Sequence, residues 1–432
     1  MVPKIFYLLQ FFTLFTVTFA STEQATALLK WKANKNNSLL GRINRLNISN
    51  VGVSGTLHDF PFSSLPFLEY VDLSVNQLSG IIPALGNLTN LVYLDLSSNQ
   101  FSGKSHLKSA RNSASLFGPI PSELGNLKNL NDLELSCNKL NGSILITLGD
   151  LTELKILYFH SNQLSGLIPN ELGNSKNLND LELCNNQLSG SIPITLGYLT
   201  KLKFLENLKN LTHLELSYTN LTGTIPITLG NNQLSGSTIT QGYLTKLKFL
   251  YLYENQLSGL IPSELRDLKN LNDLELSHNN LTGTISITLG DLTQLKILFL
   301  YSNQLSGLIP NELGNLKNLN DLELQENQLS GLISFILGDL THLKILYLYS
   351  NHLFGLIHSE LGNLKNLNHL ELSHNNLTGS ILITLGDLTD PTELGNLKNL
   401  IFQDFLCNSQ LTSYEKPLIQ KQHLDQCNHY NS

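Results

Sequence analysis

The sequence predicts an α/β solenoid, in which short strands from successive coils pair into one parallel β-sheet along a concave face. Three observations predict this fold. An Asn recurs every 24 residues from Asn255 to Asn375, an L-x-L-x-x segment precedes it, and L-[ST]-G-x-I-[PS]-x-x-L-G-x-L follows it. Repeats of about 20–29 residues built on Leu and Asn indicate coils that must stack, because one coil cannot bury its apolar face alone.

Each residue that recurs in the repeat has a physical role. The L-x-L-x-x segment predicts a short strand whose two Leu side chains enter the core, since side chains alternate along a strand. The Asn lies where the chain turns inward, and its amide donates to and accepts from backbone groups that would otherwise be buried unpaired. Gly supplies a turn that Leu could not make, and Pro suits an extended segment. Together these elements predict a leucine-rich-repeat horseshoe or superhelix of roughly fourteen coils.

The predicted Asn ladder runs through most of the chain. Its members are Asn76, Asn99, Asn138, Asn162, Asn186, Asn255, Asn279, Asn303, Asn327, Asn351 and Asn375. The step from Asn99 to Asn138 is 39 residues, and removing residues 104–118 restores the period of 24. This basic insert is either a surface loop or a faulty exon boundary.

Three other steps depart from the period. Asn186 to Thr219 and Asn375 to Asn408 are each 33 residues, and Thr219 to Asn232 is only 13. We expect breaks in the ladder at these places, because partial coils have been fused and Thr219 cannot replace all the hydrogen bonds of an Asn. The expected breaks lie near residues 204–245 and 386–408.

The amino terminus has the pattern of a secretion signal. A basic start at Lys4 precedes an apolar run over residues 5–19, and the small residues Thr18 and Ala20 precede Ser21. The run is shorter than the ~20 apolar residues of a membrane span, which favours cleavage over a retained anchor. No later segment is apolar for long enough to cross a bilayer. The predicted domains are a signal peptide at 1–20, a truncated N-terminal cap at 21–45, the solenoid at 46–408 and a C-terminal tail at 409–432.

Secretion exposes a chain to glycosylation and oxidation. Asn-x-Ser/Thr sequons occur at Asn36, Asn47, Asn87, Asn141, Asn210, Asn220, Asn280 and Asn376. Four cysteines are too few for a disulfide scaffold and are not spaced as a zinc site. Cys137 and Cys184 lie two coils apart and are expected to be free, whereas Cys407 and Cys427 either bridge to close the C-terminal end or lie in a frayed tail.

Two kinds of coil alternate, so the concave face should carry alternating acidic and aromatic rungs. In each strand, the residue between the two Leu and the residue after the second Leu face out. The acidic rungs present Glu134/Ser136, Glu182/Cys184, Glu215/Ser217, Glu275/Ser277, Glu323/Gln325 and Glu371/Ser373. The aromatic rungs present Tyr158/His160, Tyr251/Tyr253, Phe299/Tyr301 and Tyr347/Tyr349. Like rungs should lie about 9.6 Å apart, which is twice the strand spacing.

Two interpretations fit this surface. In the first, it clamps an extended peptide, with aromatic rings over apolar side chains and carboxylates meeting Lys, Arg or an amino terminus. The ligand-binding residues are then Tyr251, Tyr253, Glu275, Phe299, Tyr301, Glu323, Tyr347, Tyr349 and Glu371. In the second, recent duplication copied one rung, and Tyr and Phe are present because they suit strands.

The spacings predict neither a catalytic residue, nor a cofactor, nor a metal site. His278 and His374 are four coils apart, about 19 Å, which is too far to share a metal ion. The Glu column has a rung period of about 9.6 Å, so its carboxylates should be separated and solvated rather than paired for catalysis. We therefore expect a protein that is not an enzyme.

Composition sets further limits. The formal charge is −7, from 27 basic and 34 acidic residues. Cleavage after Ala20 would also remove Lys4 and leave a charge of −8. Charged residues make up only 14% of the chain, which argues against an acidic disordered tail or a coiled coil. The mild acidity argues against a nucleic-acid partner and favours one that is basic or carries a free amino end.

The L-S-G-x-I-P segment after the Asn resembles the plant-type leucine-rich repeat of receptor-like kinases and receptor-like proteins. The stretches Ala27–Lys32 (ALLKWK) and Gly55–Gly80 resemble the start of the ectodomain in male-discoverer-interacting receptor-like kinases. The resemblance covers about residues 1–408 and implies an extracellular receptor ectodomain. Members of that family carry a cysteine-containing cap, whereas residues 34–44 here contain no Cys. They also continue into a membrane span and a kinase, and no kinase motif occurs here, so kinase activity is not carried over.

The resemblance implies a kinase-less recognition protein of plant cell-surface signalling or defence. Its partner would be a peptide ligand or a receptor-kinase ectodomain, and its location the apoplast or the cell surface, with no membrane span of its own. One alternative is a secreted inhibitor of microbial polygalacturonase-type enzymes, whose paired cap cysteines this chain lacks. The other is a partial or decayed receptor-kinase gene product.

Overall fold

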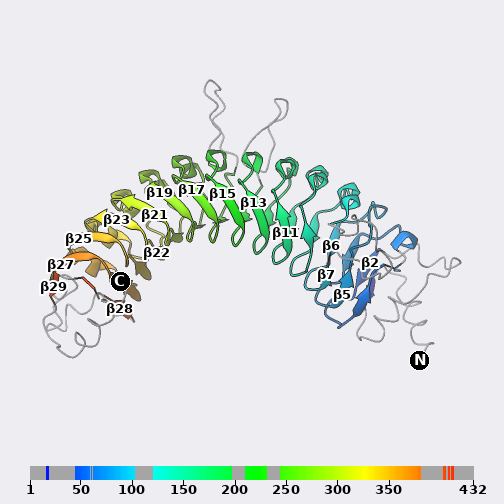
Figure 1. Cartoon of the computed structure of the whole chain (residues 1–432), viewed down its shortest axis with the longest axis horizontal. Coiled ribbons are helices and arrows are strands. Elements are labelled where there is room, and N and C mark those ends of the chain that lie inside the picture. The colour runs from blue at the N-terminus through cyan, green and yellow to red at the C-terminus, as the bar shows by residue number, and fades with distance from the viewer. Residues whose placement is uncertain are drawn as a thin grey trace, which may run out of the picture. The chain divides into compact units, whose positions relative to one another are not determined.

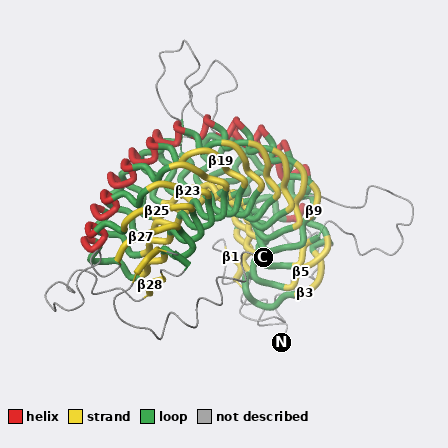
Figure 2. Tube along the Cα trace, turned by 60° about the vertical axis from the view of Figure 1, so that its left-hand side comes forward, coloured by secondary structure: helices red, strands yellow, loops and turns green. Residues whose placement is uncertain are grey.

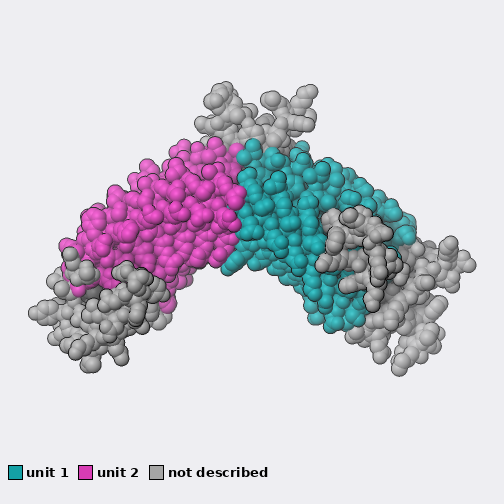
Figure 3. Space-filling view, in the orientation of Figure 1, with its two compact units in different colours: residues 1–221 teal, residues 222–432 magenta. Residues whose placement is uncertain are grey.

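The computed structural model describes residues 16–18, 44–102 except 59 and 61, 120–196, 210–230, 244–380, and 402–412 except 405, 406 and 409. They fall into two compact units, residues 1–221 (unit 1) and residues 222–432 (unit 2), coloured separately in Figure 3. In each unit the chain winds into stacked coils. Each complete coil contributes one strand to a main sheet and one lateral strand, and most coils add a short helical turn.

The main sheet contains the predicted L-x-L strands and also β1 (Thr16–Thr18), which was not predicted because it lies within the segment 1–20 expected to be a signal peptide. In unit 1 their order is β1, β2 (Arg45–Asn47), β4 (Tyr70–Asp72), β6 (Tyr93–Asp95), β8 (Asp132–Glu134), β10 (Ile156–Tyr158), β12 (Asp180–Glu182) and β14 (His213–Glu215). In unit 2 it is β16 (Phe249–Tyr251), β18 (Asp273–Glu275), β20 (Ile297–Phe299), β22 (Asp321–Glu323), β24 (Ile345–Tyr347), β26 (His369–Glu371) and β28 (Phe402–Asp404). Within each unit neighbouring strands are parallel and follow the sequence order (Figure 1).

The register of the main sheet aligns equivalent residues of successive coils. Leu274 of β18 pairs with Leu298 of β20, and Leu298 with Leu322 of β22. Because the strands are in register, side chains of equal repeat position form continuous columns across the sheet. The predicted parallel solenoid is therefore confirmed in each unit.

A lateral strand follows the ladder position in each coil, and the first three lateral strands form a sheet of their own. The lateral strands are β3 (Ser54–Thr56), β5 (Gln77–Gly80), β7 (Gln100–Phe101), β9 (Asn141–Gly142), β11 (Gln163–Gly166), β13 (Gln187–Gly190), β15 (Asn220–Gly223), β17 (Gln256–Gly259), β19 (Asn280–Thr284), β21 (Gln304–Gly307), β23 (Gln328–Gly331), β25 (His352–Leu356), β27 (Asn376–Ser380) and β29 (Gln410–Thr412). Most of these strands coincide with the [NQ]-L-[ST]-G segment. Gly283 ends such a segment with φ +78°, a conformation that an L side chain adopts only with strain.

Where a described coil has a helical turn, it is a 3-10 helix rather than an α-helix. These helices are η2 (Phe62–Ser64), η3 (Ser122–Asn126), η4 (Ile146–Asp150), η5 (Asn170–Asn174), η6 (Ile194–Leu196), η7 (Ile227–Leu229), η8 (Ser263–Asp267), η9 (Ile287–Asp291), η10 (Asn311–Asn315), η11 (Phe335–Asp339) and η12 (Ser359–Asn363). They form a row on the side of the coils away from the main sheet (Figure 2). Pro262 precedes η8 in an extended conformation (φ −62°, ψ 131°), as the I-P step predicts. Before η9 the equivalent residue is Ser286, and the Ser286 hydroxyl accepts from the N–H of Thr288.

The core lies between these three rows and consists almost entirely of Leu and Ile. In the coil that begins at β18, Leu274, Leu276, Leu281 and Leu289 are fully buried. Burying one such side chain stabilises a fold by about 1.5–3 kcal/mol, and the same set recurs in each coil. The glycine of the L-G-x-L segment allows the helical turns of successive coils to stack closely. At Gly290, for example, a Cβ would collide with the carbonyl oxygen of Glu312 in the next coil.

The Asn ladder is formed as predicted. The Oδ1 of Asn303 accepts from the N–H of Leu281 in the preceding coil at 3.0 Å. Its Nδ2 lies 3.0 Å from the carbonyl oxygen of Leu276 and within 3.2 Å of the carbonyl oxygens of Leu300 and Tyr301. The residue before the ladder position is left-handed throughout, from Val75 to Cys407, with φ between 49° and 55°. The hydrogen bonds of the ladder therefore hold a turn that most side chains disfavour.

The ladder also continues across the steps of irregular length. The Oδ1 of Asn138 accepts from the N–H of Phe101 at 2.9 Å, so the 39-residue step closes as one coil; the insert 104–118 itself lies outside the described residues. The break expected near residues 386–408 is wrong, because Asn408 accepts from the N–H of Leu377 at 3.0 Å and its Nδ2 donates to the carbonyl oxygen of Leu372 at 2.9 Å.

The break expected near residues 204–245 stays a prediction, because residues 197–209 and 231–243 lie outside the described residues. Strand β14 pairs with β12 in register, and the hydroxyl of Thr219 donates to the carbonyl oxygen of Leu216 at 3.1 Å. At both steps the chain between the described coils, residues 197–209 and 381–401, lies outside the described residues.

Candidate ligand-binding face

The exposed face of the main sheet in unit 2 carries three columns of side chains. The middle column lies between the two strand Leu and reads Tyr251, Glu275, Phe299, Glu323, Tyr347 and Glu371. The leading column precedes the first Leu and reads Phe249, Asp273, Ile297, Asp321, Ile345 and His369. The trailing column follows the second Leu and reads Tyr253, Ser277, Tyr301, Gln325, Tyr349 and Ser373. The leading column was missed from the sequence, although the alternation that identifies Glu275 also places Asp273 on this face.

Each aromatic rung presents two rings side by side. The ring centroids of Phe299 and Tyr301 are 6.1 Å apart, and those of Tyr347 and Tyr349 are 6.3 Å apart. All four side chains are partly exposed. Paired rings at this separation offer a broad apolar surface with polar hydroxyl ends, which suits an apolar side chain of a ligand.

The acidic rungs between them are charged but poorly solvated. Burial raises the pKa values of Asp273, Asp321 and Glu323 above their ordinary range. The hydroxyl of Tyr251 donates to Oδ2 of Asp273 at 3.2 Å and partly offsets this effect. A cation placed against these carboxylates would favour their ionised form, since an opposite charge within a few ångströms lowers a carboxyl pKa.

The trailing residues of the acidic rungs are not accessible, contrary to the sequence-based expectation. Ser277 is 1% exposed, Gln325 3% and Ser373 2%, whereas the tyrosines of the aromatic rungs are partly exposed. Ser136, Cys184 and Ser217 are buried in the same way in unit 1. The small side chains lie between larger ones on adjacent coils, and Gln325 turns its amide to Oε2 of Glu323 at 3.0 Å.

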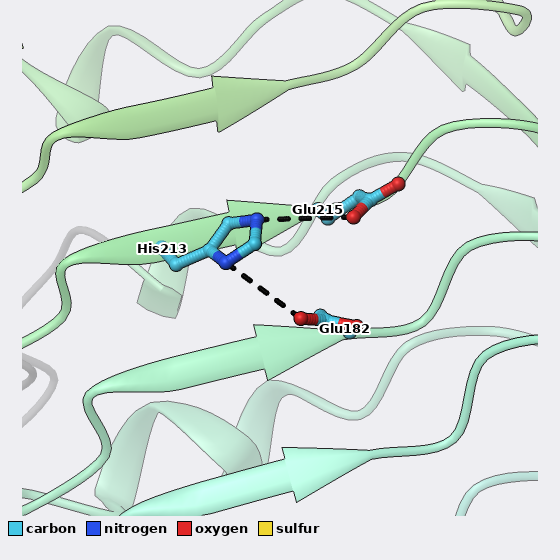
Figure 4. A group of neighbouring side chains, drawn as sticks. All are labelled: Glu182, His213 and Glu215. Carbon is cyan, nitrogen blue, oxygen red and sulfur yellow. Dashed lines mark ion pairs between the residues drawn. The ribbon is translucent and has the colours of Figure 1, made fainter. Parts of the chain in front are cut away.

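Unit 1 breaks the alternation of acidic and aromatic rungs. Glu182 of β12 pairs in register with Glu215 of β14, so two acidic rungs are adjacent instead of about 9.6 Å apart. His213 lies between them, with Nδ1 3.7 Å from Oε1 of Glu182 and Nε2 3.7 Å from Oε2 of Glu215 (Figure 4). Burial and the nearby Glu215 charge raise the pKa of Glu182 to about 7. The expectation that all Glu rungs are separated and solvated is therefore wrong here.

The predicted modification sites differ in exposure. Asn220, Asn280 and Asn376 are exposed at the starts of lateral strands, Asn87 is exposed, and Asn47, Asn141 and Asn210 are half-buried. Asn36 lies outside the described residues. Glycans at the lateral strands would leave the face of the main sheet uncovered.

The cysteines follow the sequence interpretation as far as the structure describes them. Cys137 and Cys184 are free, the first exposed and the second buried. Burial raises the pKa of the Cys184 thiol. Cys407 is disulfide-bonded, and its pairing with Cys427 stays a prediction because Cys427 lies outside the described residues.

Comparison with known proteins agrees with this arrangement. A family model described as Leucine Rich Repeat matches more than half of the chain, at residues 67–88, 90–109, 153–175, 177–199, 210–232, 246–268, 270–292, 294–316, 342–364 and 366–388. MDIS1-interacting receptor like kinase 2 from Arabidopsis thaliana is 42% identical over 99 aligned residues, which cover 17% of this chain and 10% of that protein. The chain thus spans about a tenth of the length of the curated relatives it matches.

Solved structures share the fold over most of the chain. The plant peptide hormone receptor RGFR1 in complex with RGF2 has a TM-score of 0.72 and 32% identity, covering 86% of this chain and 52% of that one. The crystal structure of PEPR1-AtPEP1 has a TM-score of 0.68 and 32% identity, covering 92% and 56%. Among the helices of the described ranges, none has the length and apolar composition that crossing a bilayer requires.

Proposed function

Because the chain belongs to the leucine-rich repeat family, we propose that it is an extracellular recognition protein of plant cell-surface signalling or defence. Its role is binding rather than catalysis, and its ligand is an extended, basic peptide held on the main-sheet face of unit 2. The similarity to a plant peptide hormone receptor in complex with its ligand supports a peptide as the partner. A partner receptor ectodomain is the other class of ligand that fits such a surface.

The observation that carries this proposal is the in-register alternation of Tyr251, Glu275, Phe299, Glu323, Tyr347 and Glu371. The three columns of unit 2 contain five carboxylates, no Lys and no Arg. Their aromatic rings are paired and partly exposed, and the carboxylates between them are desolvated. A ligand with apolar and basic side chains would cover the rings and supply the missing positive charge.

The spacing of the rungs also restricts the conformation of the ligand. Like rungs repeat at about 9.6 Å, and three residues of an extended or polyproline II chain span about 9–10 Å. A peptide that crosses the strands therefore presents every third side chain to an aromatic rung. Residues between these positions meet the acidic rungs.

Selection of phage-displayed random 12-residue peptides on the purified protein tests the proposal. We expect enriched sequences that carry Lys or Arg and place apolar residues three positions apart. Replacing Tyr251, Phe299 and Tyr347 together with Ala should weaken binding of a selected peptide about 100-fold or more, because each ring is worth about 1 kcal/mol or more when buried at an interface. Secretion of the triple variant should be unchanged.

Phe335→Ala is the matched control. Phe335 is 53% exposed and lies on η11, on the opposite side of the same unit. Its removal should change the affinity less than twofold. Equal affinity of the triple variant and the native protein would refute the proposed face, and enrichment of acidic peptides would refute the proposed charge of the ligand.

A further inference from the structure

The cluster on β10, β12 and β14 arises from the irregular repeat at residues 186–219. In unit 2 an aromatic rung separates two acidic rungs, but here the 33-residue step places Glu215 directly beside Glu182. In addition, His213 occupies the leading position, where Asp180 stands in the neighbouring strand. The departure from the repeat thus brings an imidazole between two carboxylates.

The geometry of these three side chains is compact and partly buried. The ligand atoms of Glu182, His213 and Glu215 all lie within 4.8 Å of one another. Their side chains are only 18%, 22% and 19% exposed. From the other side, His160 places Nε2 3.6 Å from Oε2 of Glu182, so that carboxylate lies between two imidazoles.

Two desolvated carboxylates on adjacent strands repel each other, and a cation between them would relieve that repulsion. Imidazole nitrogen with two carboxylate oxygens is a ligand set suited to Zn²⁺. In a tetrahedral site with bonds of about 2.1 Å, ligand atoms lie about 3.4 Å apart. The two 3.7 Å separations start from different ring nitrogens of His213, and a metal ion binds only one of them. With one atom taken from each residue, the three ligand atoms lie within 4.8 Å of one another, and rotation of the carboxylates closes the remaining distance.

We propose that Glu182, His213 and Glu215 form a binding site for Zn²⁺ on the main-sheet face of unit 1, with the fourth position open to water or to a donor group of a ligand. His160 holds the second oxygen of Glu182 and so orients this carboxylate. The site is separate from the peptide-binding residues proposed in unit 2. It replaces the sequence-based expectation that the chain has no metal site.

Titration of the purified full chain with ZnCl2 by isothermal calorimetry, in a buffer without phosphate, tests this proposal. We expect binding that Ca²⁺ and Mg²⁺ at millimolar concentration do not displace, because these hard cations prefer all-oxygen sites. His213→Asp should weaken the binding about 100-fold. This variant is expected to fold, since Asp occupies the equivalent position in β8, β12, β18 and β22. Co²⁺ added to the native protein should give visible absorption bands that the variant lacks.

His278→Ala is the control. His278 also contacts a carboxylate, with Nε2 3.8 Å from Oε1 of Glu254. Its removal should leave the affinity for Zn²⁺ unchanged, because Glu254 offers one carboxylate instead of two. If H213D does not fold, the isosteric variant Glu215→Gln replaces it. No Zn²⁺ binding to the native chain, or equal affinity in the native chain and in H213D or E215Q, would overturn the proposal.

Discussion

Asn303 provides a direct measure of what the Asn ladder contributes to the stability of unit 2. Its side chain is 9% exposed, and its amide is the acceptor for Leu281 N–H and a donor to the carbonyl oxygens of Leu276 and Leu300. Asn303→Ala removes these interactions without supplying water to the groups left behind. A buried N–H without an acceptor costs about 1–3 kcal/mol, and the two carbonyl oxygens add to that cost. We expect a loss of about 3 kcal/mol.

Hydrogen–deuterium exchange is the most informative assay, because a solenoid unfolds locally and need not melt in two states. A local loss of about 3 kcal/mol should accelerate exchange on the order of 100-fold in peptides that cover residues 274–305. Gln304→Ala is the matched control, since the adjacent Gln304 is exposed and its replacement should change stability by less than about 0.5 kcal/mol. Native-like exchange in Asn303→Ala would show that packing of the Leu core, and not the ladder, maintains the turn.

Three further perturbations test the same physical picture. Thr219→Asn should stabilise unit 1 by about 1 kcal/mol in urea unfolding. The hydroxyl of Thr219 donates to the carbonyl oxygen of Leu216, and an Asn amide would add a further donor and an acceptor at this position. Destabilisation would contradict this reasoning. Gly283→Ala should lower the unfolding free energy by about 1–3 kcal/mol, since φ is +78° and a Cβ would collide with a methyl group of Leu260. Gly166→Ala should cost less, because φ is similar (+80°) but the new Cβ would lie 3.8 Å from the Cβ of Ser143. Burial, and to a lesser extent nearby carboxylates, raises the pKa of Glu134 to about 7, so ionisation of Glu134 opposes folding. Glu134→Gln should therefore raise the free energy of unfolding relative to the native protein at pH 8 and leave it unchanged at pH 4. A difference that does not depend on pH would be inconsistent with this origin.

The repeat explains why so much of the fold follows from the sequence. Leu274, Asn279 and Gly283 recur every 24 residues with the same neighbours, so one local solution, repeated, forms the whole core. The lateral sheet and the left-handed residue before each Asn were not foreseen. Both depend on hydrogen bonds between coils, such as that from Leu281 to Asn303, which the letters of a single repeat do not display.

The sequence by itself determined the parallel main sheet, the ladder of Asn side chains and the alternation of Glu and Tyr rungs, because each depends only on residue type and on a period of 24. The tertiary structure alone decided which of these residues are neighbours where the period fails. It showed that the ladder reaches Asn408, since Asn408 accepts from the N–H of Leu377, and that Ser277 is covered while Tyr301 stays accessible. It also placed His213 between Glu182 and Glu215, because pairing of β12 with β14 brings together residues that are 33 positions apart.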